Sequence, residues 1–171
     1  MAKLVTGKVR FSYANVWEPK SINGGDEKYS VSVLVPKSDT KTVEAIKKAI
    51  EDAKKEGVAT FGGKIPNVLK TPLRDGDEER PDDPAYEGCY FFNASTSRKP
   101  QIVDAAVQPT LDRDEFYSGC YGRISVNFYA FNTNGNKGIA AGLNNLQKLA
   151  DGERLSGGST AEEDFGDGLL D

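Results

Sequence analysis

Apolar and polar residues alternate with a period of two along much of this chain. The clearest stretch, residues 119–131 (GCYGRISVNFYAF), places Ile124, Val126 and Phe128 on one face. A period of two is the repeat of a half-buried β-strand, because successive side chains point to opposite faces. The sequence therefore predicts a mainly β fold. Further strands are predicted over residues 5–17, 28–35, 88–97, 101–104 and 137–149.

The first predicted strand, residues 5–17, separates its side chains into two sets. Val5, Val9, Phe11 and Tyr13 share one face, which we expect to be the core face, and basic residues lie on the other. In the second strand, Tyr29, Val31, Val33 and Val35 are expected to face the core in the same way. The non-core faces of these two strands then carry Lys8, Arg10, Lys28, Ser30 and Ser32.

One segment changes period. In residues 40–56, Val43, Ile46, Ile50 and Ala53 lie three or four positions apart, which is the apolar stripe of an amphipathic helix. Ser38 or Asp39 can cap the start of this helix, and Gly57 can end it. Residues 57–87 and 105–118 show little periodicity, and we interpret them as long irregular connections.

About five strands, one helix and long loops predict a small barrel or sandwich. The OB-fold, a five-stranded Greek-key barrel, is the leading candidate because it tolerates loop insertions and one inserted helix. After Asp151 the periodicity stops, and residues 156–171 combine a Gly/Ser spacer with an acidic run. We therefore predict a binding domain over residues 1–150 and a disordered acidic tail over 151–171.

Charge is unevenly distributed along the chain. The formal net charge is -4, but residues 151–171 carry seven acids and one base, net -6. Residues 74–84 (RDGDEERPDDP) carry six acids and two bases, net -4, so the rest of the chain has -4 + 6 + 4 = +6. A basic body with an acidic tail is frequent among nucleic-acid binders, although many such tails only aid solubility.

Several function classes are excluded or disfavoured by composition. The chain has no histidine, which removes histidine-based triads and His-ligated zinc. Cys89 and Cys120 are expected to be reduced thiols. No run of 18 apolar residues is present, and the first seven residues lack the apolar core of a secretory signal. The acids of 74–84 keep open a metal-dependent phosphodiesterase, although their spacing fits no EF-hand loop.

The outer face of residues 119–131 is unusual for a strand exposed to water. Aromatic rings alternate there with an arginine and polar side chains, which is typical of a platform that stacks unpaired bases. The alternative is that a loop or helix covers these rings. Basic residues near the strands could contact phosphates, and Trp17 could be either a rim stacker or a core residue. The candidate DNA-binding residues are Lys8, Arg10, Trp17, Lys28, Arg98, Lys99, Tyr121, Arg123, Tyr129 and Phe131.

Long strings in this chain carry a resemblance to a known family. RFSYANVWEP (10–19), INGGDEKYSVSVLVPKSDTKT (22–42), GGKIPNVLKTPLRDGDEERPDDPAY (62–86), LDRDEFYSGCYGRISVNFYAFN (111–132) and NKGIAAGLNNLQKLADGERL (136–155) resemble phage-encoded single-stranded DNA-binding proteins of the OB-fold type. The resemblance implies a non-enzymatic, sequence-independent binder that protects ssDNA in phage replication and recombination, in the cytoplasm of the bacterial host, without a cofactor or a membrane.

The same resemblance implies a role for the C-terminal tail. In related phage replication binders, the acidic tail contacts replication partners and occupies the DNA groove when DNA is absent. The residues here that match in kind are Glu162, Glu163, Asp164, Phe165, Leu169 and Leu170. A phage structural or assembly protein with a merely solubilising tail is the other alternative, and the sequence leaves open whether the chain forms a homo-oligomer.

Overall fold

The computed structural model of this chain describes residues 2–21 and 26–155. Its strands are β1 (Ala2–Val5), β2 (Val9–Ser21), β3 (Glu27–Pro36), β4 (Arg74–Asp75), β5 (Cys89–Thr96), β6 (Gln101–Val103), β7 (Tyr121–Thr133) and β8 (Asn136–Ala150). Its helices are α1 (Thr40–Glu56), the short α2 (Gly76–Glu79) and the single 3-10 turn η1 (Pro84–Tyr86). No helix in the described ranges is long and apolar enough to cross a membrane.

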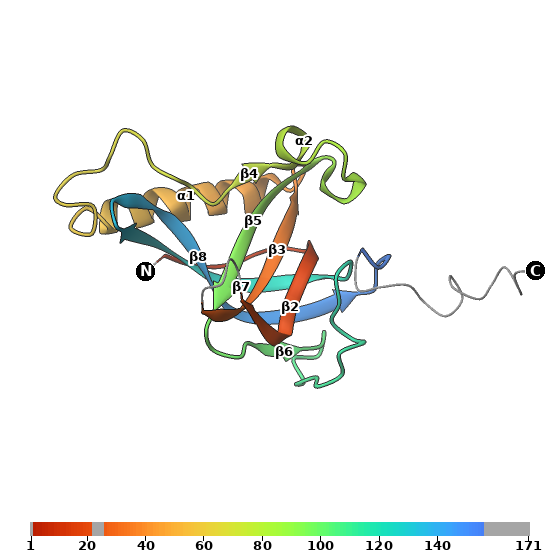
Figure 1. The fold of residues 1–171 in the computed structure, drawn as a ribbon. Coiled ribbons are helices and arrows are strands. Elements are labelled where there is room, and N and C mark those ends of the chain that lie inside the picture. Colours follow the sequence, from red (N-terminus) through yellow and green to blue (C-terminus); the bar gives the residue numbers. More distant parts are fainter. Residues whose placement is uncertain (1, 22–25, 156–171) are drawn as a thin grey trace, which may run out of the picture.

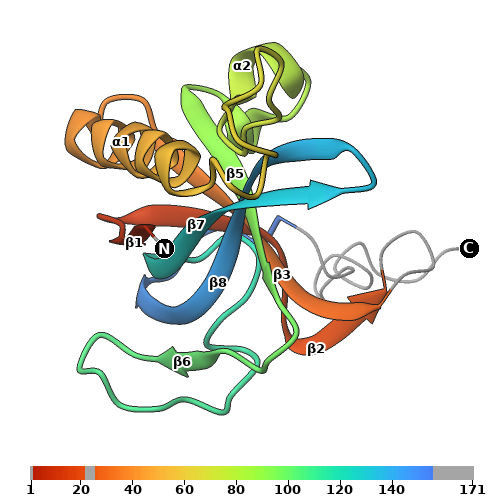
Figure 2. The same cartoon turned by 90° about the vertical axis from the view of Figure 1, so that its left-hand side faces the viewer.

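The sheet closes on itself. β7, β2, β3, β5 and β8 are hydrogen-bonded in that order, and β8 pairs back with β7. All these pairings are antiparallel except the one between β5 and β8. A five-stranded barrel closed in this order is the OB-fold architecture, which confirms the predicted fold class, and helix α1 lies between the second and third of its strands in chain order. β1 extends the sheet beyond β7, and β6 extends it beyond β8 (Figures 1 and 2).

The barrel interior holds the main hydrophobic core. Ile124, Val126 and Phe128 of β7 are fully buried in it, as their alternation predicts. The Phe128 ring lies 5.7 Å from the ring of Phe92 on β5, centroid to centroid, so the core joins strands from different parts of the barrel. Apolar side chains from alternate positions of each strand fill this space because the strand repeat is two.

Helix α1 covers one side of the barrel, next to β1 (Figure 2). Its predicted apolar stripe is buried against the core. Asp39 caps the helix by accepting a hydrogen bond from the Thr42 backbone N–H at 3.2 Å, and Gly57 ends it. The caps satisfy backbone groups that the helix leaves unpaired at its ends, so the sequence fixes both boundaries.

Closure of the barrel depends on a close approach at Gly122. A Cβ atom at this position of β7 would lie 1.8 Å from the carbonyl oxygen of Gln147 on β8 and 3.1 Å from the Phe11 ring. The register of the β7–β8 pair shifts between Tyr121 and Gly122. Only glycine lets the two backbones pass this closely where the strands bend.

The first predicted strand differs from the structure in two respects. It is divided into β1 and β2 around residues 6–8, and Val5 is 49% exposed. Tyr13, predicted on the core face, is 52% exposed and points outward. The cause is a register shift between Ser12 and Asn15, where Tyr13 adopts a positive φ of 47°. A bulge adds a residue to one strand and turns the following side chains to the opposite face.

The predicted irregular segment 57–87 contains elements that pack on the outside of the barrel. α2 and η1 lie at one end of the molecule, and β6 lies at the other end (Figures 1 and 2). The η1 residue Tyr86 is buried with Leu34 of β3 and Phe91 of β5 in a second hydrophobic cluster. We call residues 74–88, which this cluster fixes to the outer face of the sheet, the acidic excursion.

Candidate nucleic-acid interface

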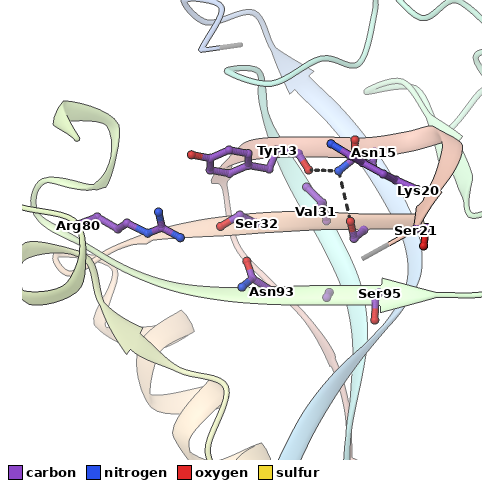
Figure 3. Close-up of a pocket in the computed structure, with 11 residues that line it drawn as sticks. Tyr13, Asn15, Lys20, Ser21, Val31, Ser32, Arg80, Asn93 and Ser95 are labelled. Carbon is purple, nitrogen blue, oxygen red and sulfur yellow. Dashed lines mark hydrogen bonds between the residues drawn. The ribbon is translucent and has the colours of Figure 1, made fainter. Parts of the chain in front are cut away.

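A groove of about 690 Å³ runs over the outer faces of β2, β3 and β5 (Figure 3). Its lining comes from all three strands and from the acidic excursion. The lining residues are Tyr13, Asn15, Lys20, Ser21, Ser30, Val31, Ser32, Arg80, Asn93, Ala94 and Ser95.

The floor of the groove is made of short polar side chains in cross-strand register. Ser32 of β3 pairs with Asn93 of β5, and Ser30 pairs with Ser95. On the other side, Asn15 of β2 pairs with Ser30, and its amide nitrogen donates to the Ser30 hydroxyl at 3.4 Å. The Ser32 hydroxyl is buried and accepts a hydrogen bond from Tyr86, whereas Ser30, Asn93 and Ser95 are at least partly exposed. Hydroxyls and amides both donate and accept hydrogen bonds, so these exposed side chains can meet the edge of any base. The predicted outward orientation of Ser30 and Ser32 is confirmed.

Tyr13 is the aromatic residue that lines this groove. Its ring projects over β3 (Figure 3) because the β2 bulge places residue 13 in the left-handed region. The Asn15 amide nitrogen donates to the Tyr13 carbonyl oxygen at 3.3 Å, which ties the bulge together. A non-glycine residue with positive φ is strained, and such strain is often found at binding sites. The sequence did not predict Tyr13 as a site residue, because the alternation of apolar and polar residues does not indicate where a bulge occurs.

Cations lie at the borders of the groove. Lys20 lines it near the end of β2 and is paired in register with Lys28 of β3, one of the predicted DNA-binding residues. Arg80 lines it from the acidic excursion. These positive charges can neutralise the phosphates of a strand that follows the groove.

Three other predicted residues meet beside a second, smaller cavity of about 350 Å³. Lys8 and Arg10 both lie over the Tyr121 ring, each 5.3 Å from its centroid. The Arg10 guanidinium also donates to the carbonyl oxygens of Gly119 at 3.0 Å and Glu153 at 2.8 Å. A basic and aromatic cluster therefore lies at the start of β2, although Arg10 already has two partners.

Trp17, Arg98 and Lys99 lie around the far end of β2 and β5. Trp17 is half-buried against the core, and its ring N–H donates to the Phe116 carbonyl at 2.9 Å. The same residue lines a small cavity together with Lys99. Arg98 is exposed just beyond β5.

The outer face of β7 does not form part of the large groove. Arg123 donates to the Thr6 carbonyl at 2.9 Å. Tyr129 is 36% exposed and lines a small cavity with residues at the C-terminal end of α1. Phe131 is half-buried and lies against Gly138 of β8, whose added Cβ would meet its ring at 2.8 Å. β7 thus spreads its aromatic residues along the barrel instead of concentrating them beside Ser30 and Ser32.

The carboxylates of the acidic excursion have structural partners. The Lys37 ammonium binds Asp75 at 2.7 Å and Asp77 at 2.8 Å, which lowers the pKa of both carboxyls and raises the pKa of Lys37. Arg74 binds Glu79 at 2.8 Å. Within residues 2–21 and 26–155, no group of three acids or cysteines is placed to hold a metal ion. Cys89 and Cys120 are free thiols, as expected, and burial raises the pKa of each.

The last described residues, 151–155, pack against the barrel. The Leu155 N–H donates to the Ser118 carbonyl at 3.0 Å. The Ser118 hydroxyl accepts a hydrogen bond from the Ala14 N–H at 2.9 Å, next to Tyr13. The chain therefore leaves the described region beside the β2 bulge. The predicted partner-binding residues of the tail, from Glu162 to Leu170, lie outside the described residues.

Comparisons with known proteins relate this geometry to DNA binding. Residues 2–171 match the profile of a family described as "Enterobacter phage Enc34, ssDNA-binding protein". Protein p50 of Acyrthosiphon pisum secondary endosymbiont phage 1 is 33% identical over 174 residues, with 96% of this chain and 93% of that protein covered.

Solved structures agree with this match. The fold is similar to that of the single-stranded DNA-binding protein from bacteriophage Enc34 in complex with ssDNA, with a TM-score of 0.82, 25% identity, and 91% of this chain and 90% of that chain covered. It also resembles gp2.5 of bacteriophage T7 in fold, with a TM-score of 0.64, 15% identity, and 98% and 94% covered. This chain therefore belongs to the Enc34 family of phage single-stranded DNA-binding proteins, which bind DNA without enzymatic chemistry.

Proposed function

We propose that ssDNA lies in the groove over β2, β3 and β5 and is bound with little sequence preference. The observation that carries this proposal is Tyr13, a half-exposed ring held over the groove by a strained bulge. Every base has a π-face, so stacking on one ring tolerates any sequence. The Enc34 relative of similar fold has been solved with ssDNA, which supports an OB-fold groove as the binding surface.

Positive charges of the protein would bind the phosphates of the DNA. The body of the protein outside residues 74–84 and the tail carries a net charge of +6. Lys20 and Lys28 lie side by side at one border of the groove. If three to five phosphates are neutralised, log Kobs should fall with log salt concentration with a slope of about -2 to -4. A slope near zero would contradict the electrostatic part of the proposal.

The test compares Tyr13→Ala with Tyr129→Ala in a fluorescence-anisotropy titration against a labelled oligonucleotide. Both residues are tyrosines on exposed strand faces, but only Tyr13 lines the groove. We expect Tyr13→Ala to weaken binding by about 1–3 kcal/mol and Tyr129→Ala to change it little. The opposite result would move the binding surface to the outer face of β7, with Tyr121, Arg123 and Phe131.

The remaining candidate residues extend the proposed interface beyond the groove. Lys8, Arg10 and Tyr121 lie at the start of β2, on the other side of the acidic excursion. Trp17 lies in the second half of β2, and Arg98 and Lys99 follow the end of β5. Single alanine substitutions at these positions can be measured in the same titration. The end of the groove at which they weaken ssDNA binding more is the end at which the DNA path continues.

We further infer that the protein protects ssDNA during phage replication or recombination, in the cytoplasm of the bacterial host. Its acidic tail would recruit replication or recombination proteins and compete with DNA for the groove. Residues 151–171 have a net charge of -6, and the chain reaches Leu155 beside Ala14. A polyanion tethered next to the groove has a high effective concentration there.

Deleting residues 156–171 tests the tail. Binding to ssDNA should tighten at low salt and change less at high salt, where the competition is screened. A pull-down of replication proteins by the full chain should be lost with the truncated chain. If the truncated protein binds DNA no tighter at low salt and still retains its partners, the tail serves solubility only.

A further inference from the structure

We propose that Arg80, in the middle of the acidic excursion, contacts a DNA phosphate, and that ion pairs of Lys37 hold Arg80 in position. This inference rests on the proposed function of the groove and adds a contact from a segment, residues 74–88, whose net charge is -5. The acidic excursion would otherwise repel a polyanion, so a DNA contact here requires one cation to be kept apart from the acids around it.

The position of Arg80 is the first argument. Its side chain lines the groove together with Tyr13, and both extend over Ser32 of β3 (Figure 3). Tyr13 reaches this place from the β2 bulge, while Arg80 comes from the opposite side of the groove. A nucleotide stacked on the Tyr13 ring therefore lies within the same cavity as the Arg80 guanidinium. Guanidinium groups bind phosphate through several donors at once.

The second argument is that Arg80 has no acidic partner within residues 2–21 and 26–155. Six carboxylates lie within residues 74–84, yet the structure pairs none of its described acids with Arg80. Asp75 and Asp77 bind Lys37, and Glu79 binds Arg74. An arginine that remains unpaired among acids keeps its charge available for an incoming anion.

Two aromatic rings lie against the Arg80 guanidinium. It lies 5.7 Å from the ring centroid of Tyr86 and 5.9 Å from that of Phe91. These two rings pack edge to face at 5.0 Å, and the Tyr86 hydroxyl donates to the Ser32 hydroxyl at 3.1 Å. The side chain of Arg80 is therefore ordered before DNA arrives, which reduces the entropy lost on binding.

Lys37 acts as a positioning residue. It follows β3 directly, and its two ion pairs bind the first turn of α2 to the end of that strand. The same Asp77 accepts a hydrogen bond from the Gly88 N–H at 3.0 Å, so one carboxylate joins both ends of the excursion. The Arg80 backbone N–H donates to Gly76 at 2.9 Å, which places Arg80 at the end of the turn held by Lys37.

The first experiment measures the salt dependence of ssDNA binding for Arg80→Ala, Arg80→Lys and Arg74→Ala. Arg74 is the matched control, because it belongs to the same excursion but is paired with Glu79. We expect Arg80→Ala to weaken binding about tenfold at low salt and to make the slope of log Kobs against log salt shallower by about 0.7. Arg80→Lys should retain the slope, and Arg74→Ala should change affinity less than twofold.

A merely structural arginine would leave the salt slope unchanged, so an unchanged slope for Arg80→Ala refutes the phosphate contact. The failure of the groove itself can be recognised separately. If Tyr13→Ala weakens binding and Arg80→Ala does not, only the Arg80 inference fails. If neither substitution weakens binding, the groove is not the DNA site.

The second experiment tests the role of Lys37 through its partners. Asp75→Asn/Asp77→Asn removes two negative charges and the ion pairs but keeps side-chain acceptors, whereas Glu78→Gln/Asp82→Asn removes two negative charges from exposed positions of the excursion. If the acids acted only as charges, both double variants would tighten DNA binding. We expect the first to weaken it at least threefold and the second to leave it equal or tighter. Equal behaviour of the two variants would overturn the positioning role.

Discussion

The strained bulge at Tyr13 leads to a prediction that separates stability from binding. Tyr13 has φ = 47°, a conformation that residues with a Cβ atom rarely adopt. Replacing it with alanine removes the ring but keeps the strain, whereas replacing it with glycine removes both. Because the loss of the ring is common to the two variants, the difference between them reports the backbone conformation alone.

The expected size of this difference follows from two opposing contributions. A left-handed conformation costs a residue with a Cβ atom about 1–2 kcal/mol, and glycine does not have this cost. Glycine is in turn less favourable than alanine by about 0.5–1 kcal/mol, because it gains more freedom in the unfolded chain. Tyr13→Gly should therefore be more stable than Tyr13→Ala by roughly 0–1.5 kcal/mol, with a central value of about 0.8 kcal/mol.

Urea unfolding followed by circular dichroism measures both free energies of unfolding, provided that the two variants have the same m-value. In parallel, anisotropy should show that both variants bind ssDNA more weakly than the natural protein, by about 1–3 kcal/mol. An alanine variant that is more stable than the glycine variant would refute the left-handed assignment. A glycine variant with unchanged DNA affinity would refute the role of the ring.

Three further predictions concern the core, the barrel closure and the acidic excursion. Phe128→Ala should lower the free energy of unfolding by about 3–5 kcal/mol in urea titrations, because this ring is fully buried. Gly122→Ala should prevent native closure of the β7–β8 pair, seen as loss of dispersed amide signals in NMR spectra, since its Cβ would lie 1.8 Å from a β8 carbonyl oxygen. The hydrogen bond to Lys37, supported by that from Gly88, lowers the pKa of Asp77. The stability from this lowered pKa is present above about pH 4, the unfolded value, and is lost as pH falls through the lower folded value. In an NMR titration, the Asp77 carboxyl and the Gly88 amide should therefore shift together below pH 4; a Gly88 signal that does not move would contradict this link.

The sequence alone determined the elements whose side-chain pattern is local. The alternation over residues 119–131 identified Ile124, Val126 and Phe128 as core, and the stripe over 40–56 identified α1 with its cap and its end. Strings spread over the chain carried the family resemblance. These features are readable because burial follows the 2.0 and 3.6 residue repeats of strand and helix, which depend on neighbours within one element.

The tertiary structure alone decided which outer faces form the groove. Tyr13 left the expected core face because of a bulge whose register is set by pairing between β2 and β3. The alternation predicts a base-stacking surface on the aromatic residues of β7, but the closure of the barrel places Tyr129 near the end of α1. Arg80 stands within an acidic run of the sequence, which gives no sign of a DNA contact. Only the packing of Tyr86 on Leu34 and Phe91 brings Arg80 over the groove. Contacts between distant segments set these positions, and periodicity along the chain contains no information about which distant segments will meet.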